Sequence, residues 1–422
     1  MPSGYENYTI RQKTKHKQTA AGLILFCLAT GPALAHEEGA DGHLIPHEFA
    51  GLNFDGGTTW FLQATSGAKK DTAALTYTLD LSIEKEMEGR GKVAVAFEAG
   101  DGEGVDPDIG TLSAVNYDAF FTELTNNVGG STNVVALSIS QAYYENEWGS
   151  GRLVIDVGKL DVHSFFDDNA FANDETDQYL SAIFTRSADT SYKQLDFYYA
   201  PAIALQYQPV PLVGMTLIAA NGNKSGFSDI FNQMYYVGQI NFMPGLGGYE
   251  GNYRVYALLD NRDSVNTTFT RINSVSMPDI QAGDLSKGKR EENTAWGLSF
   301  DQALPGDLGV FARFSSQDDK FIENLVESSW SFGALVEGKR WGRKGDSFGV
   351  AYGSVNVNKD PAVLAYAGLS KADDETHFEV FYKCGYKDHY TITPDIQVIN
   401  NIGGDASADS VIVYGVRSQL NF

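Results

Sequence analysis

Residues 74–84 read Ala-Leu-Thr-Tyr-Thr-Leu-Asp-Leu-Ser-Ile-Glu, and this stretch decides the class of fold. Polar side chains (Thr, Asp, Ser, Glu) alternate strictly with the apolar ones, which are Leu75, Tyr77, Leu79, Leu81 and Ile83. A period of two places successive side chains on opposite faces of an extended chain. The stretch therefore predicts a β-strand with one apolar face and one polar face.

The same alternation recurs along most of the chain. Further apolar faces stand at Val93-Val95-Phe97, Val135-Leu137-Ile139, Leu153-Ile155-Val157, Leu195-Phe197-Tyr199, Tyr253-Val255-Ala257-Leu259, Trp296-Leu298-Phe300, Trp330-Phe332-Ala334-Val336, Phe348-Val350-Tyr352 and Phe378-Val380-Tyr382. After the N-terminal region no run of ~18 apolar residues occurs, so no membrane-spanning helix is expected there. The sequence predicts an all-β protein.

The connections between these strands alternate in length, which separates two all-β architectures. Short turns at 147–151, 208–213, 244–251, 303–307 and 386–389 are interleaved with long polar segments at 101–133, 161–192, 221–233, 261–293, 317–328 and 356–375. This organisation is typical of a transmembrane antiparallel β-barrel with short periplasmic turns and long extracellular loops. From residues 58–66 to residues 410–422 we count about 16 strands. The alternative is a secreted glycan-binding β-sandwich, whose strands would alternate in the same way.

Composition and charge exclude other classes. The 422 residues are 43% hydrophobic and 12% aromatic, which is too apolar for a disordered chain. The formal net charge is −23, and the phosphates of nucleic acid require a basic surface, so nucleic acid is not an expected partner.

The N-terminus has the pattern of a secretory signal peptide. A basic region containing Arg11 and Lys17 precedes a short apolar core at 20–29, and Ala33-Leu34-Ala35 matches a cleavage site. We therefore divide the chain into a cleaved signal peptide (1–35), a mature N-terminal segment (36–57) and a barrel domain (58–422). Cleavage leaves 27 basic and 53 acidic side chains, a net charge of −26, and a single cysteine, Cys384. An intramolecular disulfide is then not expected.

The last strand carries the sharpest local signal. One face holds apolar side chains up to the terminal residue, and the other holds Val413, Gly415, Arg417, Gln419 and Asn421. We expect the barrel-assembly machinery to recognise the aromatic end of this strand, and the residues assigned to that signal are Tyr414, Leu420 and Phe422. An apolar strand edge of this length would promote aggregation in a water-soluble protein.

Several stretches resemble the OprB-type carbohydrate-selective porins of the bacterial outer membrane. These stretches are Gly158-Lys159-Leu160-Asp161, Phe165-Phe166-Asp167, the run from Asn169 to Glu175, and His389 to Ile399. The chain departs from the family at Asn401-Ile402-Gly403-Gly404, where Asn-Pro-Gly-Gly is frequent, and residues 264–292 match no family feature. The resemblance implies a 16-stranded outer-membrane barrel that passes sugars by passive diffusion.

A sugar pathway needs groups that bond hydroxyls and rings that cover C–H faces. Alternation places such groups on the polar, lumen-facing side of the strands, and the pore-lining and sugar-binding candidates are Asp80, Glu84, Glu98, Arg152, Asp156, Arg254, Tyr256, Asp260, Arg313, Arg417 and Gln419. Facing guanidinium and carboxylate groups would create a transverse field across the water column. Each contact has to stay weak, because the solute must leave as readily as it enters.

The long segment 161–192, which carries the family motif, is the candidate constriction loop. An inward loop narrows a barrel of this size, whose lumen is otherwise wide. The constriction candidates are Asp161, Phe165, Phe166, Asp167, Asn169, Asn173, Asp174 and Glu175.

Other motifs point to no further chemistry. No G-x-S-x-G, H-E-x-x-H or C-x-x-C motif occurs, and His163 is near Asp161 and Ser164 in sequence alone, so an enzyme is not expected. The N-terminal group of His36, Glu37, Glu38, His43 and His47 lies before the first strand and is interpreted as a tail. No cofactor or metal is expected, although calcium bound to an acidic loop is an alternative. The run Asp101, Glu103, Asp106 and Asp108 lacks the spacing of an EF-hand.

The expected partners follow from this reading. They are outer-membrane lipid and lipopolysaccharide, mono- or oligosaccharides and small ions as permeants, and the barrel-assembly machinery. The barrel is expected to be a monomer or a homotrimer. The alternative channel function is a general diffusion porin that favours cations, because the loops carry a surplus of acid.

Overall fold

The computed structural model describes residues 48–89, 91–119, 137–188, 199–222, 230–231, 233–265, 280, 290–386 and 389–421. These residues belong to one compact unit, Pro46–Phe422. The expected signal peptide, the N-terminal histidines and the terminal Phe422 lie outside the described residues.

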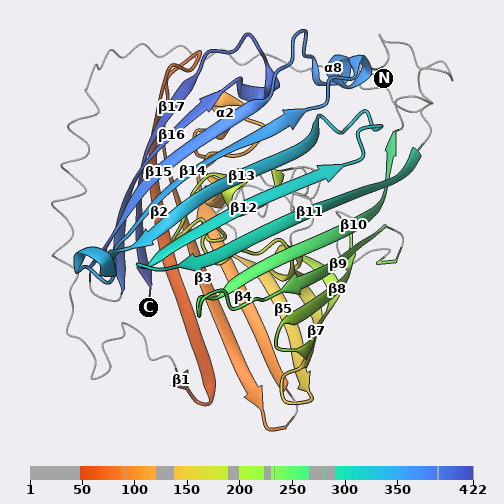
Figure 1. The fold of residues 1–422 in the computed structure, drawn as a ribbon, viewed down its shortest axis with the longest axis vertical. Coiled ribbons are helices and arrows are strands. Elements are labelled where there is room, and N and C mark those ends of the chain that lie inside the picture. Colours follow the sequence, from red (N-terminus) through yellow and green to blue (C-terminus); the bar gives the residue numbers. More distant parts are fainter. Residues whose placement is uncertain are drawn as a thin grey trace. The chain divides into compact units, whose positions relative to one another are not determined.

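Strands dominate the described chain (Figure 1). They are β1 (Glu48–Phe49), β2 (Leu52–Ser66), β3 (Ala73–Met87), β4 (Gly91–Asp101), β5 (Ser138–Trp148), β6 (Leu153–Asp161), β7 (Tyr199–Val210), β8 (Val213–Asn221), β9 (Met234–Phe242), β10 (Gly251–Val265), β11 (Arg290–Leu304), β12 (Leu308–Gln317), β13 (Val326–Glu337), β14 (Ser347–Val357), β15 (Glu375–Tyr386), β16 (Tyr390–Asn400) and β17 (Val411–Asn421). The helical turns are α2 (Asp106–Ile109), η1 (Val162–Phe165), α4 (Ala182–Thr185), η2 (Gly338–Trp341), α8 (Pro361–Ala367) and η3 (Ile402–Gly404).

The strands from β2 to β17 form a closed antiparallel ring. Each strand pairs with the next one along the chain, and β17 returns to β2 with Asn421 opposite Gly57 and Ile412 opposite Ser66. The two-residue β1 folds back on the start of β2. The prediction of a 16-stranded antiparallel barrel is confirmed. The alternative of a β-sandwich is wrong, because the strands that the structure describes all belong to one continuous sheet that closes on itself.

The two rims differ in the length of their connections. One rim carries short turns at 88–90, 149–152, 211–212, 243–250, 305–307, 338–346 and 387–389. The other rim carries connections at 67–72, 102–137, 162–198, 222–233, 266–289, 318–325, 358–374 and 401–410. The pairing of Gly57 with Asn421 places both ends of the ring at the short-turn rim. The first long strand starts at Leu52, before the expected residue 58, because Leu52 and Phe54 already alternate with the exposed Asn53 and Asp55.

The outward face of the ring is an apolar band. Trp60, Leu217, Val255 and Phe332 are 44%, 59%, 52% and 52% exposed. Trp60 also stacks on Tyr77 of the neighbouring strand at 4.9 Å between ring centroids. Exposed rings and aliphatic chains around a closed ring form a surface that suits lipid and is unfavourable in water.

The inward face is polar and largely covered. Two connections from the long-loop rim enter the ring and pack against its wall (Figure 1). We call residues 102–119 the β4–β5 segment and residues 162–188 the β6–β7 segment. Side chains of these two segments pack against the inner wall of the ring, and they define the site.

Candidate functional site

Arg313 of β12 holds the centre of the β6–β7 segment. Its Nε lies 3.2 Å from Oδ1 of Asp167, and both side chains are 1% exposed. Its terminal nitrogens donate to the carbonyl oxygens of Asp167, Ala172 and Phe184. A guanidinium presents five donors in a fixed plane, so one side chain fixes three points of the segment.

Two other arginines hold the ends of the same stretch. Arg254 of β10 lies 2.7 Å from Oδ1 of Asp168 through Nε and 2.5 Å from Oδ2 of Asp301 through a terminal nitrogen. Arg417 of β17 donates to the carbonyl oxygen of Glu175 at 2.6 Å. The β6–β7 segment is therefore attached to the ring at β10, β12 and β17.

Two buried glutamates of β15 bind the backbone of the two segments. Glu379 accepts the N–H groups of Leu180 at 2.7 Å and of Ser181 at 2.9 Å. Glu375 accepts the N–H of Leu112 at 2.9 Å through each of its oxygens. A carboxylate that satisfies buried backbone donors removes the cost of leaving them unpaired.

The two segments also bind each other inside the ring. The N–H of Ala182 donates to the carbonyl of Ala114 at 2.8 Å, and the N–H of Tyr117 donates to the carbonyl of Leu180 at 3.0 Å. Gln63 and Gln397, from strands on either side of the closure, both donate to the carbonyl of Val115. The segments thus form one body that narrows the lumen.

Aromatic packing holds the β6–β7 segment against the wall of β12 and β15. The ring centroid of Tyr179 lies 5.5 Å from that of Phe184, 5.4 Å from that of Phe311 and 5.1 Å from that of Phe381. The Tyr179 hydroxyl donates to the carbonyl of Ala334 at 2.7 Å. The four rings are buried, so water is excluded from this contact between the segment and the wall.

Gly309 of β12 has no side chain and so leaves room for the β6–β7 segment against the wall. A Cβ at Gly309 of β12 would stand 2.2 Å from Cδ1 of Phe171. The ring of Phe171 therefore lies directly on the backbone of β12, which any larger residue would prevent.

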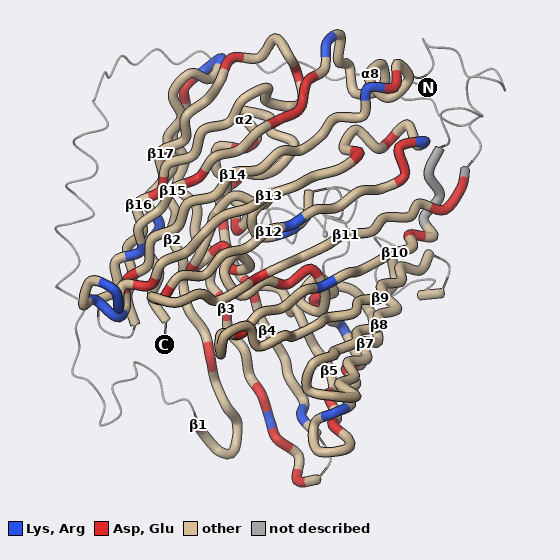
Figure 2. The backbone as a smooth tube through the Cα atoms, in the orientation of Figure 1, with Lys and Arg blue, Asp and Glu red and all other residues tan. Residues whose placement is uncertain are grey.

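Most of the charged side chains at the inward positions of β3 to β6 are acidic. They include Asp80, Glu84, Glu98, Glu145 and Asp156, with Lys92 lying 3.2 Å from Glu84 and 3.5 Å from Glu145. The Tyr199 hydroxyl donates to Glu98 at 3.0 Å. Figure 2 shows acidic positions spread over strands and connections alike. This part of the lumen wall is therefore negatively charged.

Glu175 and Asp106, which lie in the two segments, have raised pKa values. Burial, followed by the adjacent Asp174 carboxylate, raises the pKa of Glu175 to about 7. Burial also raises the pKa of Asp106 to about 6, although the backbone N–H groups of Val115 and Asn116 donate to it and favour its charged form. The Glu175 carboxyl is therefore partly protonated near neutral pH.

The predicted pore-lining residues fall into two groups in the structure. Asp80 and Arg152 are exposed and Glu84 is partly exposed. The others are buried, and they are Glu98, Asp156, Arg254, Tyr256, Asp260, Arg313, Arg417 and Gln419. We expected Arg254, Arg313 and Arg417 to face a solute across open water. They instead bond the β6–β7 segment, because a buried guanidinium needs carboxylate and carbonyl partners that the segment supplies.

Tyr256 and Gln419 also contact the β6–β7 segment. The Tyr256 hydroxyl donates to Oγ of Ser187 at 2.9 Å, and the Gln419 amide donates to Oγ1 of Thr176 at 3.0 Å. Their sugar-binding role stays a prediction.

The predicted constriction residues lie at the end of β6 and along the β6–β7 segment, with different surroundings. The Asp161 carboxylate accepts the N–H of His163 at 3.0 Å, while Phe165 is half-buried against the core cluster around Phe166. The ring of Phe166 meets that of Tyr256 edge-on at 5.5 Å.

The polar constriction residues mostly shape the segment itself. The Asn169 amide donates to the carbonyl of Phe300 at 3.0 Å, and Asn173 accepts from Arg186. Asp174 is exposed and accepts the N–H of Thr176 at 2.8 Å. Whether these residues set the narrowest point stays a prediction.

Sequence reasoning missed the glutamates of β15 and the glycine of β12. Glu375, His377 and Glu379 occupy the polar face of a strand whose apolar face, Phe378-Val380-Tyr382, was recognised. The period of two could have placed them inward, but it carries no signal for the loop backbone that they bind.

The residues considered for calcium binding and for catalysis make other contacts in the structure. Among the described residues, no group of three or more His, Cys, Asp or Glu side chains is arranged to hold a metal. Asp106, from the run considered for calcium, bonds backbone N–H groups instead. The Ser164 hydroxyl donates to the carbonyl of Asp161 at 2.8 Å, which is a turn contact.

The fold and the site together define a class of protein. No helix within the described ranges is long and apolar enough to cross a membrane. A closed 16-stranded ring with an apolar exterior, a polar interior and inward segments is an outer-membrane β-barrel of the porin class. Residues 110–422 match the family described as "Carbohydrate-selective porin, OprB family", and the chain belongs to this family. The bacterial outer membrane is its location.

Similar proteins of known name are porins. "Porin AaxA" of Chlamydia abortus is 24% identical over 303 residues, which cover 70% of this chain and 59% of that protein. "Porin AaxA" of Chlamydia felis is 22% identical over 302 residues, covering 70% and 60%. The matched region thus spans about three fifths of the length of these relatives.

Among solved structures, the fold is similar to that of Pseudomonas putida OprB. The high pH structure superposes with a TM-score of 0.73 at 16% identity and covers 88% of this chain and 94% of that chain. The low pH structure superposes with a TM-score of 0.53 at 13% identity, covering 88% and 93%. At these identities the likeness concerns the fold alone.

Proposed function

We propose that the protein is an outer-membrane channel for passive diffusion of small carbohydrates. The observation that carries this proposal is the polar lumen of a closed ring, narrowed by a β6–β7 segment that Arg313 and Asp167 fix in place. A fixed constriction selects solutes by width, and the polar groups around it replace the hydrogen bonds that a sugar loses with water. Membership of a carbohydrate-selective family supports the same reading.

Swelling of proteoliposomes tests the proposal. The purified barrel would be reconstituted and exposed to isotonic solutions of a pentose, a hexose, a disaccharide and a trisaccharide. We expect rapid swelling with the smaller sugars and a steep decrease of the rate with size. Absence of swelling with every sugar, in vesicles whose ionic conductance shows inserted channels, would refute a sugar channel.

A general porin that favours cations is the second candidate function. The acidic inward positions of β3 to β6 and the acidic members of the β6–β7 segment support it. Carboxylates at a constriction raise the local concentration of cations and lower that of anions. The reversal potential in a KCl gradient measures this preference, and the two candidates separate when sugar flux and ion selectivity are measured on the same channel.

The remaining assignments complete the proposal. Residues 1–35 direct export and are removed. The barrel-assembly machinery recognises the last strand, in which Tyr414 is 49% exposed and Leu420 is half-buried on the outward face. Lipid and lipopolysaccharide surround the apolar band. The barrel works as a monomer or a homotrimer without a cofactor, and the oligomeric state is measurable by native mass spectrometry.

A further inference from the structure

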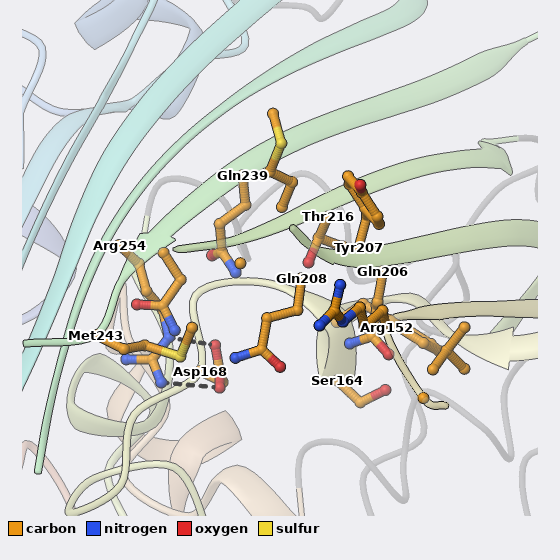
Figure 3. A pocket seen from close by; sticks show the side chains of 16 residues that line it. Arg152, Ser164, Asp168, Gln206, Tyr207, Gln208, Thr216, Gln239, Met243 and Arg254 are labelled. Atoms are coloured by element: carbon orange, nitrogen blue, oxygen red, sulfur yellow. Dashed lines mark hydrogen bonds and ion pairs between the residues drawn. The ribbon is translucent and has the colours of Figure 1, made fainter. Parts of the chain in front are cut away.

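A polar cavity lies between the ring and the start of the β6–β7 segment. Its volume is about 290 Å³, and Figure 3 shows the side chains that line it. The wall contributes residues at the short-turn ends of β6 to β10, including Gln206 on β7 and Asn241 on β9. The segment contributes Ser164, Phe165 and Asp168. The cavity is therefore on the short-turn side of the segment.

The cavity combines hydrogen-bond donors and acceptors that hold fixed positions. Gln239 is 7% exposed, and its Oε1 accepts the N–H of Asp167 at 3.0 Å, which fixes the amide at the cavity edge. The Asn241 amide donates to Oδ1 of Asn252 at 3.0 Å, which fixes this side chain in the same way. Amide groups that hold fixed positions at a cavity can exchange hydrogen bonds with the hydroxyl groups of a ligand. The lining therefore favours a ligand that carries hydroxyl groups.

The charges around the cavity compensate each other, which excludes a strongly charged ligand. The Asp168 carboxylate receives Nε of Arg254 at 2.7 Å and a terminal nitrogen at 3.1 Å, and Asp301 receives the other terminal nitrogen of Arg254. Arg152 is the exposed cation at the rim. Two guanidinium groups and two carboxylates leave little net charge, so neither an anion nor a cation gains from the local field.

We propose that this cavity is a sugar-binding subsite on the short-turn side of the constriction. This inference rests on the proposed function and assigns one place where the permeating sugar binds transiently. Its ligand is a neutral carbohydrate of one or two rings, because the volume is at the lower end of the ~300–1,000 Å³ range of ligand pockets. Asp168 accepts from sugar hydroxyls, Arg152 and the Gln206 amide donate to them, and the ring of Phe165 offers a surface for a C–H face.

The test compares sugar binding in two variants of the reconstituted channel. Arg152→Ala/Gln206→Ala removes two exposed lining groups that do not hold the segment. The control is Arg340→Ala, an exposed arginine in the β13–β14 connection at the same rim. The concentration of maltose or glucose that halves the single-channel current is measured in each, together with the conductance in KCl without sugar.

We expect the double variant to need about ten-fold more sugar for half block, since each lost hydrogen bond weakens binding by about three- to five-fold. The control should match the wild type, and the sugar-free conductance of all three shows that the barrels are folded and inserted. Equal half-blocking concentrations in the wild type and the double variant would overturn the subsite while leaving the sugar channel intact. The swelling assay separates the two failures, because proteoliposomes with conducting channels that admit no sugar would contradict the proposed function itself.

Discussion

Asp167 and Arg313 form an ion pair inside the barrel across 146 residues of sequence, and each side chain is 1% exposed. Asp167 also accepts the N–H of Ser187 at 2.8 Å, so its carboxylate ties both ends of the β6–β7 segment to β12. The segment is thus part of the folded wall and holds a defined position in the lumen.

Neutralising Asp167 should release the segment. Asp167 has a φ of +54°, a conformation that Asn tolerates, so Asp167→Asn changes the charge and leaves the backbone geometry available. Loss of one partner leaves the Arg313 charge buried, which costs about 3–5 kcal/mol. We expect a larger and noisier single-channel conductance. The control is Asp108→Asn, an exposed carboxylate on α2, and equal conductance in both variants would contradict this role for the pair.

Glu379→Gln should loosen the backbone around Leu180 and Ser181. An amide offers one acceptor oxygen where the carboxylate bonds both N–H groups, so one buried donor loses its partner at a cost of about 1–3 kcal/mol. Hydrogen exchange at these two amides should accelerate by about ten-fold or more. Glu375→Gln provides the reciprocal control, because it should affect Leu112 and leave Leu180 protected. Faster exchange at the same amides in both variants would indicate a general loss of structure.

Gly309→Ala should strain the contact with Phe171. The added Cβ would stand 2.2 Å from the ring, and overpacking of this kind costs about 1–3 kcal/mol. We expect a lower unfolding temperature, which Phe171→Ala restores in the double variant. Gly238→Ala is the matched control, since its Cβ meets Leu217 at an ordinary 3.6 Å. If the decrease in unfolding temperature of the double variant equals the sum of the decreases in the two single variants, the two residues do not touch.

Ion selectivity should depend on pH through Glu175. Its pKa is about 7, above the ordinary 4.5, so the folded barrel binds the proton more strongly than the unfolded chain and the group loses its charge as the pH falls through 7. Cation preference should therefore decrease between pH 8 and pH 5.5. Glu175→Gln should lower the preference at pH 8 and reduce its pH dependence, whereas Glu88→Gln in the β3–β4 turn should do neither. An unchanged pH profile in Glu175→Gln would assign the effect to other carboxylates.

The sequence predicts the ring well and its interior poorly, for a physical reason. The alternation in residues 74–84 follows directly from the pleat of a strand, so the faces of β3 could be assigned before the structure. The same alternation places Arg313 and Glu379 inward. It cannot say that Arg313 bonds Asp167 or that Glu379 bonds Ser181, because these contacts depend on the path of a loop with no periodic pattern.

The current through a single channel in the presence of sugar tests the central claim most directly. The account predicts that the KCl current of the wild-type barrel falls with increasing sugar and saturates, because the solute occupies a lumen that the β6–β7 segment has narrowed. A current that decreases only in proportion to the conductivity of the bulk solution would contradict a channel built to bind and pass carbohydrates.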